Sequence, residues 1–446
     1  MTSSLGDLAA QALDLVRTAA PSAEAAVSVD RTEQRLTRFA TSFIHQNVAD
    51  ESTSVTLTVH VDGRTTVAST TLTGDEGLRA LVERTVGATR LAPADASWPG
   101  LVPPTPLTGT GTVDQSVLAA TPDDRAAVVQ EFVRAAGGLE TAGYCRTKHW
   151  TGAYANSAGQ LIEGAATSAD FDGIARNNGA DSAARIASTR MSDLDGTALG
   201  ERVGRNARAL TSAVELPAGE YEVVLLPEAV GDILTNFAFY GFNGKQHNEG
   251  RSFARLGEAQ FDPAITLADD PVTAGNIGQP YDGEGTPRRV LKLVDAGITT
   301  AVAHDRRTAV KADTDSTGHY SGEGGWGPMT ENLVLSPGSA TLAELIRGVR
   351  RGLLVTDFWY TRVLDPRQMT LTGLTRNGVW LIEDGEIGTP VQNFRFTQSY
   401  PQALAPGRVL GVGDVAVPQP SRWGLGSWTG PALRLASWNF TGNASG

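Results

Sequence analysis

Apolar and polar residues alternate in regular patterns at the start of the chain. Apolar residues recur at helical spacing over residues 5–16 and again over residues 78–86, which predicts two amphipathic helices. Between them, valine and leucine alternate with serine, threonine and histidine over residues 54–61, and Asp62-Gly63 follows. This pattern is typical of a half-buried strand that ends in a hairpin turn. We therefore expect an α/β domain at the N-terminus.

Proline-rich stretches divide the rest of the chain. Residues 91–113 contain five prolines and are the best linker candidate. Thr121-Pro122-Asp123-Asp124 then predicts a helix start, because threonine caps, proline fits the first turn and acids favour the positive end of the helix dipole. Short strands and a helix near residues 197–210 follow, which indicates a middle α+β region. Pro217-Ala218-Gly219 marks the next boundary.

Strand patterns dominate after that boundary. One helix, over residues 342–349, interrupts them. The strand candidates are short apolar runs at residues 221–226, 290–294, 333–335, 353–360 and 379–382. The predicted fold class is therefore α+β. The predicted organisation is an N-terminal domain at 1–90, a linker at 91–113, a central domain at 114–216 and a mainly-β C-terminal domain at 217–446.

Composition and charge narrow the classes of partner. The 446 residues are 41% hydrophobic, which is sufficient for several cores, and the net charge is −12. An acidic chain is a poor match to a phosphate backbone, so we expect no nucleic-acid ligand. No apolar run reaches the length of about 18 residues that a membrane helix needs. The first ten residues do not resemble a secretory signal, so we expect a cytoplasmic protein without a membrane partner.

The residue types that carry most catalytic chemistry are sparse. Cys145 is the single cysteine, so no internal disulfide forms. No two of the six histidines have the spacing that places both on one helical face, and no H-E-x-x-H motif occurs. The loop from Gly318 to Pro328 contains the pattern G-x-G-x-x-G, but no amphipathic helix follows it. This loop is therefore a better candidate for covering a substrate than for binding a dinucleotide.

A polar cluster at residues 38–47 has two interpretations. Its sequence is Arg-Phe-Ala-Thr-Ser-Phe-Ile-His-Gln-Asn. Arg38, His45, Gln46 and Asn47 are candidates for hydrogen bonds to a substrate in a groove. Alternatively, these side chains lie at a strand edge and are satisfied locally.

Several segments in order along the chain resemble the TldD/PmbA family, a family of metallopeptidases and modulators of DNA gyrase. The first is the cluster at residues 38–47. The others are at residues 216–232, 281–298, 316–338, 351–356 and 381–391. Each segment is short, and their common order over nearly the whole chain is what carries the resemblance.

The resemblance also places this chain on one branch of the family. In TldD-like members a helix carries H-E-x-x-x-H, whose histidines bind zinc and whose glutamate acts as general base, and a cysteine near the C-terminus completes the site. The matching residues here are Pro227, Glu228 and Asp232, and no cysteine follows Cys145. The motif is thus degenerate, since only Glu228 remains. TldE/PmbA-like subunits share this loss.

The resemblance therefore implies a non-catalytic subunit of a TldD/TldE-type metallopeptidase complex. The implied partner is a TldD-like paralogue that binds the zinc, so this chain itself needs no cofactor or metal. This chain would complete a chamber for peptide substrates, with a homodimer as another possible assembly. Its candidate groove residues are the four polar residues of the cluster at 38–47 together with Gly318, His319 and Trp326.

Two alternatives remain open from the sequence. One is a self-sufficient hydrolase with a relocated site, built from Glu228, Asp232 and a distant histidine such as His247 or His304. The other is a stand-alone peptide-binding or regulatory protein without a peptidase partner.

Overall fold

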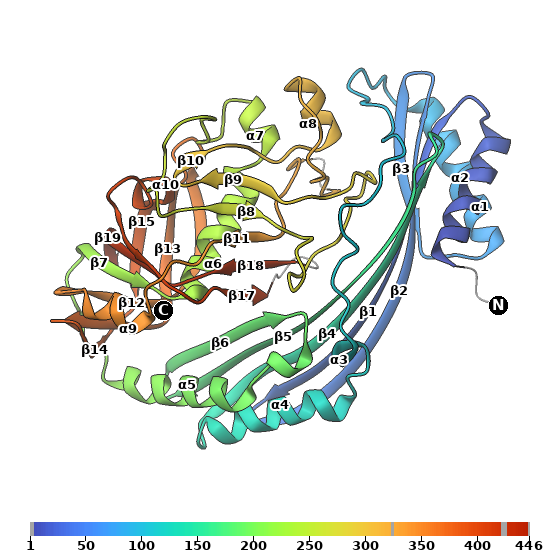
Figure 1. The fold of residues 1–446 in the computed structure, drawn as a ribbon. Coiled ribbons are helices and arrows are strands. Elements are labelled where there is room, and N and C mark those ends of the chain that lie inside the picture. The colour runs from blue at the N-terminus through green and yellow to red at the C-terminus, as the bar shows by residue number, and fades with distance from the viewer. Residues whose placement is uncertain (1–3, 323–324, 421–425, 445–446) are drawn as a thin grey trace.

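A long six-stranded antiparallel sheet forms the N-terminal half of the molecule and curves around the C-terminal half (Figure 1). The computed structural model describes residues 4–322, 325–420 and 426–444. The strand order in this sheet is β3-β2-β1-β4-β5-β6. The strands are β1 (Glu24–Ala40), β2 (Phe43–Val61), β3 (Arg64–Thr70), β4 (Glu140–Asn156), β5 (Leu161–Asn177) and β6 (Ala180–Ser188).

The centre of this sheet joins two distant parts of the sequence. Strands β1 and β4 pair from Ala26 opposite Asn156 to Phe39 opposite Gly143. The ranges 1–90 and 114–216 therefore contribute strands to one continuous sheet. The intervening segment carries α2 and the proline-rich residues 91–113.

Two pairs of helices pack on the outer face of the sheet (Figure 1). Helices α1 (Leu5–Ala19) and α2 (Asp75–Leu91) cover one end, and α4 (Pro122–Ala135) and α5 (Gly196–Ala209) cover the other; α3 (Gln115–Leu118) is a single turn. Because side chains alternate between the faces of a strand, the odd-numbered residues of β1 point towards the helices. Val27 and Val29 pack against α1 and α2, and Phe39 packs against α4. The predicted cap at Thr121 is confirmed.

The inner face of the sheet is polar. Even-numbered residues of β4, including Tyr144, Arg146 and Lys148, lie on this face. Arg146 Nε donates to Asp170 Oδ1 of the neighbouring strand at 2.9 Å. Near one end of the face, Trp150 and Tyr154 pack against segments outside the sheet and form a small apolar cluster. The sheet therefore presents charged side chains towards the C-terminal half.

The C-terminal half contains two sheets with α6 (Pro227–Asn236) packed against strands of both. One sheet has the order β10-β9-β8-β11-β18-β17. Its strands are β8 (Leu267–Asp269), β9 (Leu291–Asp295), β10 (Ile298–Thr299), β11 (Leu333–Leu335), β17 (Val417–Pro420) and β18 (Ser427–Gly430). The short helices are α7 (Gly244–Asn248), α8 (Arg306–Lys311), α9 (Leu342–Arg347) and α10 (Tyr400–Ala403).

The second sheet of this half has the order β12-β7-β19-β15-β13-β14, with β16 paired to β19. Its strands are β7 (Gly219–Leu225), β12 (Arg351–Asp365), β13 (Thr370–Glu383), β14 (Glu386–Val391), β15 (Phe394–Ser399), β16 (Val409–Val412) and β19 (Leu433–Asn443). The largest core of the molecule lies between the two sheets and includes Phe237, Phe396 and Trp438. The α+β fold class and the mainly-β character of this half are thus confirmed.

The predicted linker is fixed to the C-terminal half. Arg306 of α8 donates through its guanidinium to the carbonyl oxygens of residues 99, 100 and 101. Arg307 forms a two-pronged ion pair with Asp95, at 2.9 and 2.6 Å. Because of these bonds, the segment is anchored over part of its length. Within the described ranges, no helix is long and apolar enough to cross a membrane.

Candidate functional site

Helix α6 carries the degenerate motif and begins directly after β7. Leu226 is its N-cap residue and Pro227 occupies the first turn, where its missing N–H needs no partner. The helix packs against β12, β17 and β18. The motif therefore lies between the two C-terminal sheets, with its first turn facing the long N-terminal sheet.

The carboxylate of Glu228 is held by an arginine from the N-terminal half. Arg202 of α5 donates through Nη2 to Glu228 Oε1 at 2.6 Å, and the glutamate side chain is only 3% exposed. The second oxygen, Oε2, is buried and has no hydrogen-bond partner among the described residues. An isolated buried carboxylate is costly, so the guanidinium supplies the charge that keeps this glutamate in place.

A second buried ion pair lies beside Glu228. Asp357 of β12 accepts from Arg185 Nη1 at 2.6 Å and from Asn377 Nδ2 at 2.9 Å. Arg185, on β6, also binds Asp172 at 3.0 Å. Burial raises the pKa of Asp357 against the opposing effect of Arg185, and the nearby charge of Glu228 adds to the increase. Two arginines from the long sheet and its helix thus neutralise two acids of the C-terminal half.

Asp232, four residues along α6, has a separate set of partners. Its Oδ1 accepts from Thr361 Oγ1 at 2.9 Å, and its Oδ2 accepts from the Tyr400 hydroxyl at 2.9 Å. Asn236 Nδ2 lies 3.3 Å from the same Oδ2. Both carboxylates of the motif are therefore engaged in bonds within the fold. In the described part of the chain, no three His, Cys, Asp or Glu side chains are grouped so that they could hold a metal ion.

The candidate groove residues of the first cluster lie at the edge of the long sheet. Arg38 on β1 is opposite Gln46 on β2, and both are exposed. The Asn47 side chain instead accepts from Thr37 Oγ1 at 2.6 Å, while His45 is exposed next to Phe43. Strand β3 pairs with β2 only from Val55 onwards, so residues 43–54 have no second strand partner among the described residues.

The candidates in the loop after α8 separate into two groups. Gly318 and His319 are buried, and the His319 side chain has no exposed area. Trp326 is 41% exposed and packs edge-on against Phe239 and Tyr240 of the π-helical turn that follows α6. Residues 323 and 324, which belong to the glycine pattern, lie outside the described residues. The loop thus presents one aromatic surface next to α6.

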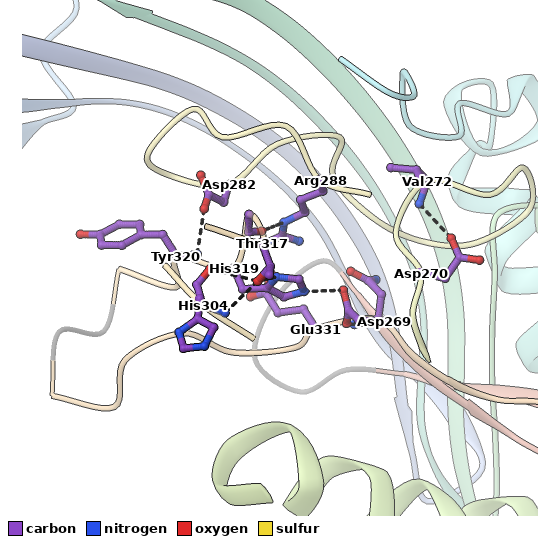
Figure 2. Close-up of polar contacts among 12 residues, drawn as sticks. Asp269, Asp270, Val272, Asp282, Arg288, His304, Thr317, His319, Tyr320 and Glu331 are labelled. Carbon is purple, nitrogen blue, oxygen red and sulfur yellow. Dashed lines mark hydrogen bonds and ion pairs between the residues drawn. The ribbon is translucent and has the colours of Figure 1, made fainter. Parts of the chain in front are cut away.

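A buried polar cluster holds the start of this loop (Figure 2). His319 Nε2 lies 3.0 Å from Asp269 Oδ2, and its Nδ1 lies 2.8 Å from Thr317 Oγ1. Asp269 also accepts from the Asn332 backbone N–H at 2.7 Å. Arg288 donates to the Gly318 carbonyl at 3.0 Å and to Glu331 at 2.7 Å.

Sequence patterns gave no indication of this cluster. Asp269 and His319 are 50 residues apart in the chain, and no local pattern links them. Asp269 ends strand β8 and His319 lies in the loop after α8, so a long-range contact between a strand and a loop brings the two side chains together.

Similar proteins share the fold and part of the sequence. Residues 218–442 match the family model described as the PmbA/TldA metallopeptidase C-terminal domain. A metalloprotease of Methanothermobacter thermautotrophicus is 27% identical over 220 residues, which are 48% of each chain, so the present chain spans about half the length of this relative.

Solved structures extend the likeness to nearly the whole chain. TldE from Thermococcus kodakarensis superposes with a TM-score of 0.85 at 18% identity, covering 97% of this chain and 100% of its own. A proposed modulator of DNA gyrase from Thermotoga maritima gives 0.84 at 18% identity, with the same coverage. The family match over half of the chain, and the colinear motifs within it, show that this protein belongs to the PmbA/TldD family.

Proposed function

We propose that this chain is the non-catalytic, TldE-like subunit of a cytoplasmic metallopeptidase complex whose TldD-like partner holds zinc. One observation carries the proposal. Glu228, the remaining residue of the catalytic motif, is bound by Arg202, while Pro227 and Asp232 occupy the positions of the zinc-binding histidines. The glutamate that acts as general base in the partner thus has a structural role here.

The chemistry of zinc supports this assignment. A catalytic zinc generally needs three protein ligands and a water, which it converts to hydroxide near neutral pH. Proline offers no side-chain ligand, and the Asp232 carboxylate already accepts from Thr361 and Tyr400. A cation beside Glu228 would also be repelled by the positive charge of Arg202. Such repulsion between like charges is strong at a buried site.

In this proposal, the chain contributes to substrate binding. An extended peptide can add to an open strand edge by main-chain hydrogen bonds, and residues 43–54 of β2 offer such an edge. Arg38 and Gln46 are exposed beside it. Peptide hydrolysis would then take place at the partner's zinc, with this chain enclosing the substrate.

Reconstitution tests the proposal directly. This chain and an H-E-x-x-x-H paralogue from the same genome are purified separately, analysed for zinc, and assayed alone and mixed on an unfolded peptide. We expect stoichiometric zinc in the paralogue, peptidase activity in the mixture, and loss of that activity with a chelator. Chelator-sensitive cleavage by this chain alone would instead establish a self-sufficient hydrolase, and failure to associate with any paralogue would favour a stand-alone binding protein.

The strand edge can be tested separately. Because the native thiol at Cys145 is buried, Gln46→Cys can be labelled selectively with a photoreactive group. We expect this variant, in the complex, to crosslink an added peptide. Gln402→Cys provides a matched control, since Gln402 is exposed on α10 of the C-terminal half and does not belong to the long sheet. Equal crosslinking at both positions would contradict binding along residues 43–54.

A further inference from the structure

A pocket separate from the degenerate motif lies in the C-terminal half between α7, α8 and β9. Its volume is about 640 Å³, within the usual range for small-molecule sites. No motif residue of α6 lines it. Residues of α7, α8 and β9, together with the loops beside them, form its wall.

We propose that this pocket binds a small organic anion through a phosphate or carboxylate group. Arg289 and Lys311 line it, and neither forms an ion pair within the described residues. The neighbouring Arg288, by contrast, is buried and paired with Glu331. Among the described residues that line the pocket, Asp315 is the one carboxylate, so positive charge exceeds negative charge there.

His304 provides a buried ring nitrogen for the ligand. His304 is only 6% exposed and lies on the wall of the pocket. Thr308 Oγ1 lies 2.8 Å from Asp305 Oδ1 and 3.2 Å from His304 Nδ1. Because the threonine proton is best donated to the carboxylate, Nδ1 carries the imidazole proton and donates to Thr308. The other nitrogen, Nε2, has no hydrogen-bond partner among the described residues.

The placement of this ring depends on a glycine. A Cβ atom at Gly244 would lie 2.4 Å from His304 Nδ1 and from the Ala303 carbonyl oxygen, so no larger residue fits there without displacement. Figure 2 shows the ring of His304 turned away from the pair formed by His319 and Asp269. The imidazole thus packs closely against the start of α7 and is not part of that buried pair.

The remaining lining favours an organic anion over a bare ion. Leu256, Leu291 and Val302 provide apolar surface, while Thr300 and Thr314 place hydroxyl groups among the charged residues. Binding sites for small molecules combine such apolar walls with a few polar groups that fix orientation. His247 adds a second imidazole. In the described ranges these histidines are not joined by a third ligand in a metal-binding group.

Anion binding at this pocket should depend on pH. Burial lowers the pKa of His304, and the nearby His247 and His319 lower it further against the opposing effect of Asp305. Arg289 and Lys311 face the same space, and Asp315 opposes them. A bound anion raises the pKa of His304, so binding takes up a proton and the affinity rises as the pH falls, by up to about tenfold for each unit of pKa increase.

Calorimetric titration of the full-length chain tests the proposal, with inorganic phosphate and acetate as probes at pH 8 and pH 5.5. We expect saturable binding of at least one probe, and binding should be weaker by about tenfold or more in the Arg289→Gln/Lys311→Gln variant. Acetate, which stays ionised at both pH values, should bind more tightly at pH 5.5, whereas phosphate itself loses a charge at that pH. These two side chains are exposed, so the variant should fold normally. Preference between the probes distinguishes a phosphate ligand from a carboxylate ligand.

Two further variants complete the experiment. His304→Gln should remove most of the pH dependence of anion binding. Lys292 is exposed and lies outside the pocket, so the Lys292→Ala variant should bind the probes as tightly as the unmodified chain does. Absence of saturable binding of both probes at pH 5.5 would overturn the proposal. Binding that the double variant leaves unchanged would overturn it equally, because the anion would then lie elsewhere.

Discussion

The buried pair of Asp269 and His319 allows a quantitative test of how the loop after α8 is held. Both side chains have no exposed area, and Asp269 accepts from His319 at 3.0 Å and from the Asn332 N–H at 2.7 Å. Asp269→Asn preserves the shape but removes the charge that both bonds use. A hydrogen bond to a charged group contributes about 1.5–3 kcal/mol, so weakening these two bonds should lower the free energy of unfolding by about 3–5 kcal/mol.

Thermal unfolding followed by tryptophan fluorescence measures this loss. For a folding unit of about 200 residues, each kcal/mol corresponds to about 2–4 °C, so the expected decrease in Tm is about 6–20 °C. Asp295→Asn is the matched control, because Asp295 pairs with Lys292 at 3.1 Å but both side chains are about half exposed. An exposed pair contributes at most about 1 kcal/mol. If the two variants unfold within about 2 °C of each other, the buried pair does not hold the loop.

The pH dependence provides an independent check on the same pair. Burial alone would raise the pKa of Asp269, but the interaction with His319 outweighs it and the net pKa is lowered. A carboxyl group with a lowered folded-state pKa stabilises the protein above its unfolded pKa, and this contribution is lost as the pH falls. The difference in Tm between the unmodified chain and Asp269→Asn should therefore shrink below about pH 4.

Three other variants or reagents test different parts of the structure. Arg202→Met leaves the Glu228 carboxylate buried without its partner and should cost about 1–3 kcal/mol in urea unfolding; adding Glu228→Gln should recover part of the loss. Burial raises the pKa of Cys145 to about 12, so a thiol reagent should label it only after denaturation; rapid labelling of the native chain would contradict its burial. Burial, and then the charge of Asp282, raises the pKa of Glu284. Stability should therefore fall as the pH rises above the usual glutamate range, and Glu284→Gln should flatten the decrease in Tm between pH 5 and pH 9.

Elements with local signals could be predicted from the sequence. Thr121 caps α4 as its sequence predicts, because capping depends only on neighbouring residues. Strand β2 was predicted only over residues 54–61, although it extends from Phe43 to Val61. Alternation is clear only in that part, since it packs under α1 and α2, whereas residues 43–52 are mostly exposed. A strand without a buried face has no period to detect.

Of the candidate site, only the degenerate motif on α6 could be predicted from the sequence. Substitution at Pro227 and Asp232 is visible in the sequence, but the bond from Arg202 to Glu228 joins helices of different halves of the molecule. No local pattern encodes that contact. The same holds for His319, whose sequence neighbours suggested a substrate loop while its partner Asp269 lies on a distant strand. Long-range polar contacts depend on the packing of whole sheets.

The pairing of β1 with β4 has a consequence for synthesis of the chain. Ala26 of β1 lies opposite Asn156 of β4. Strand β1 therefore cannot pair with β4 until more than a hundred further residues have left the ribosome. Until then, one edge of the hairpin formed by β1 and β2 is unpaired in the nascent chain. Contacts between such distant segments form slowly, and unpaired edges are prone to aggregation. Folding of this protein should therefore depend on translation speed and on chaperones that shield β1.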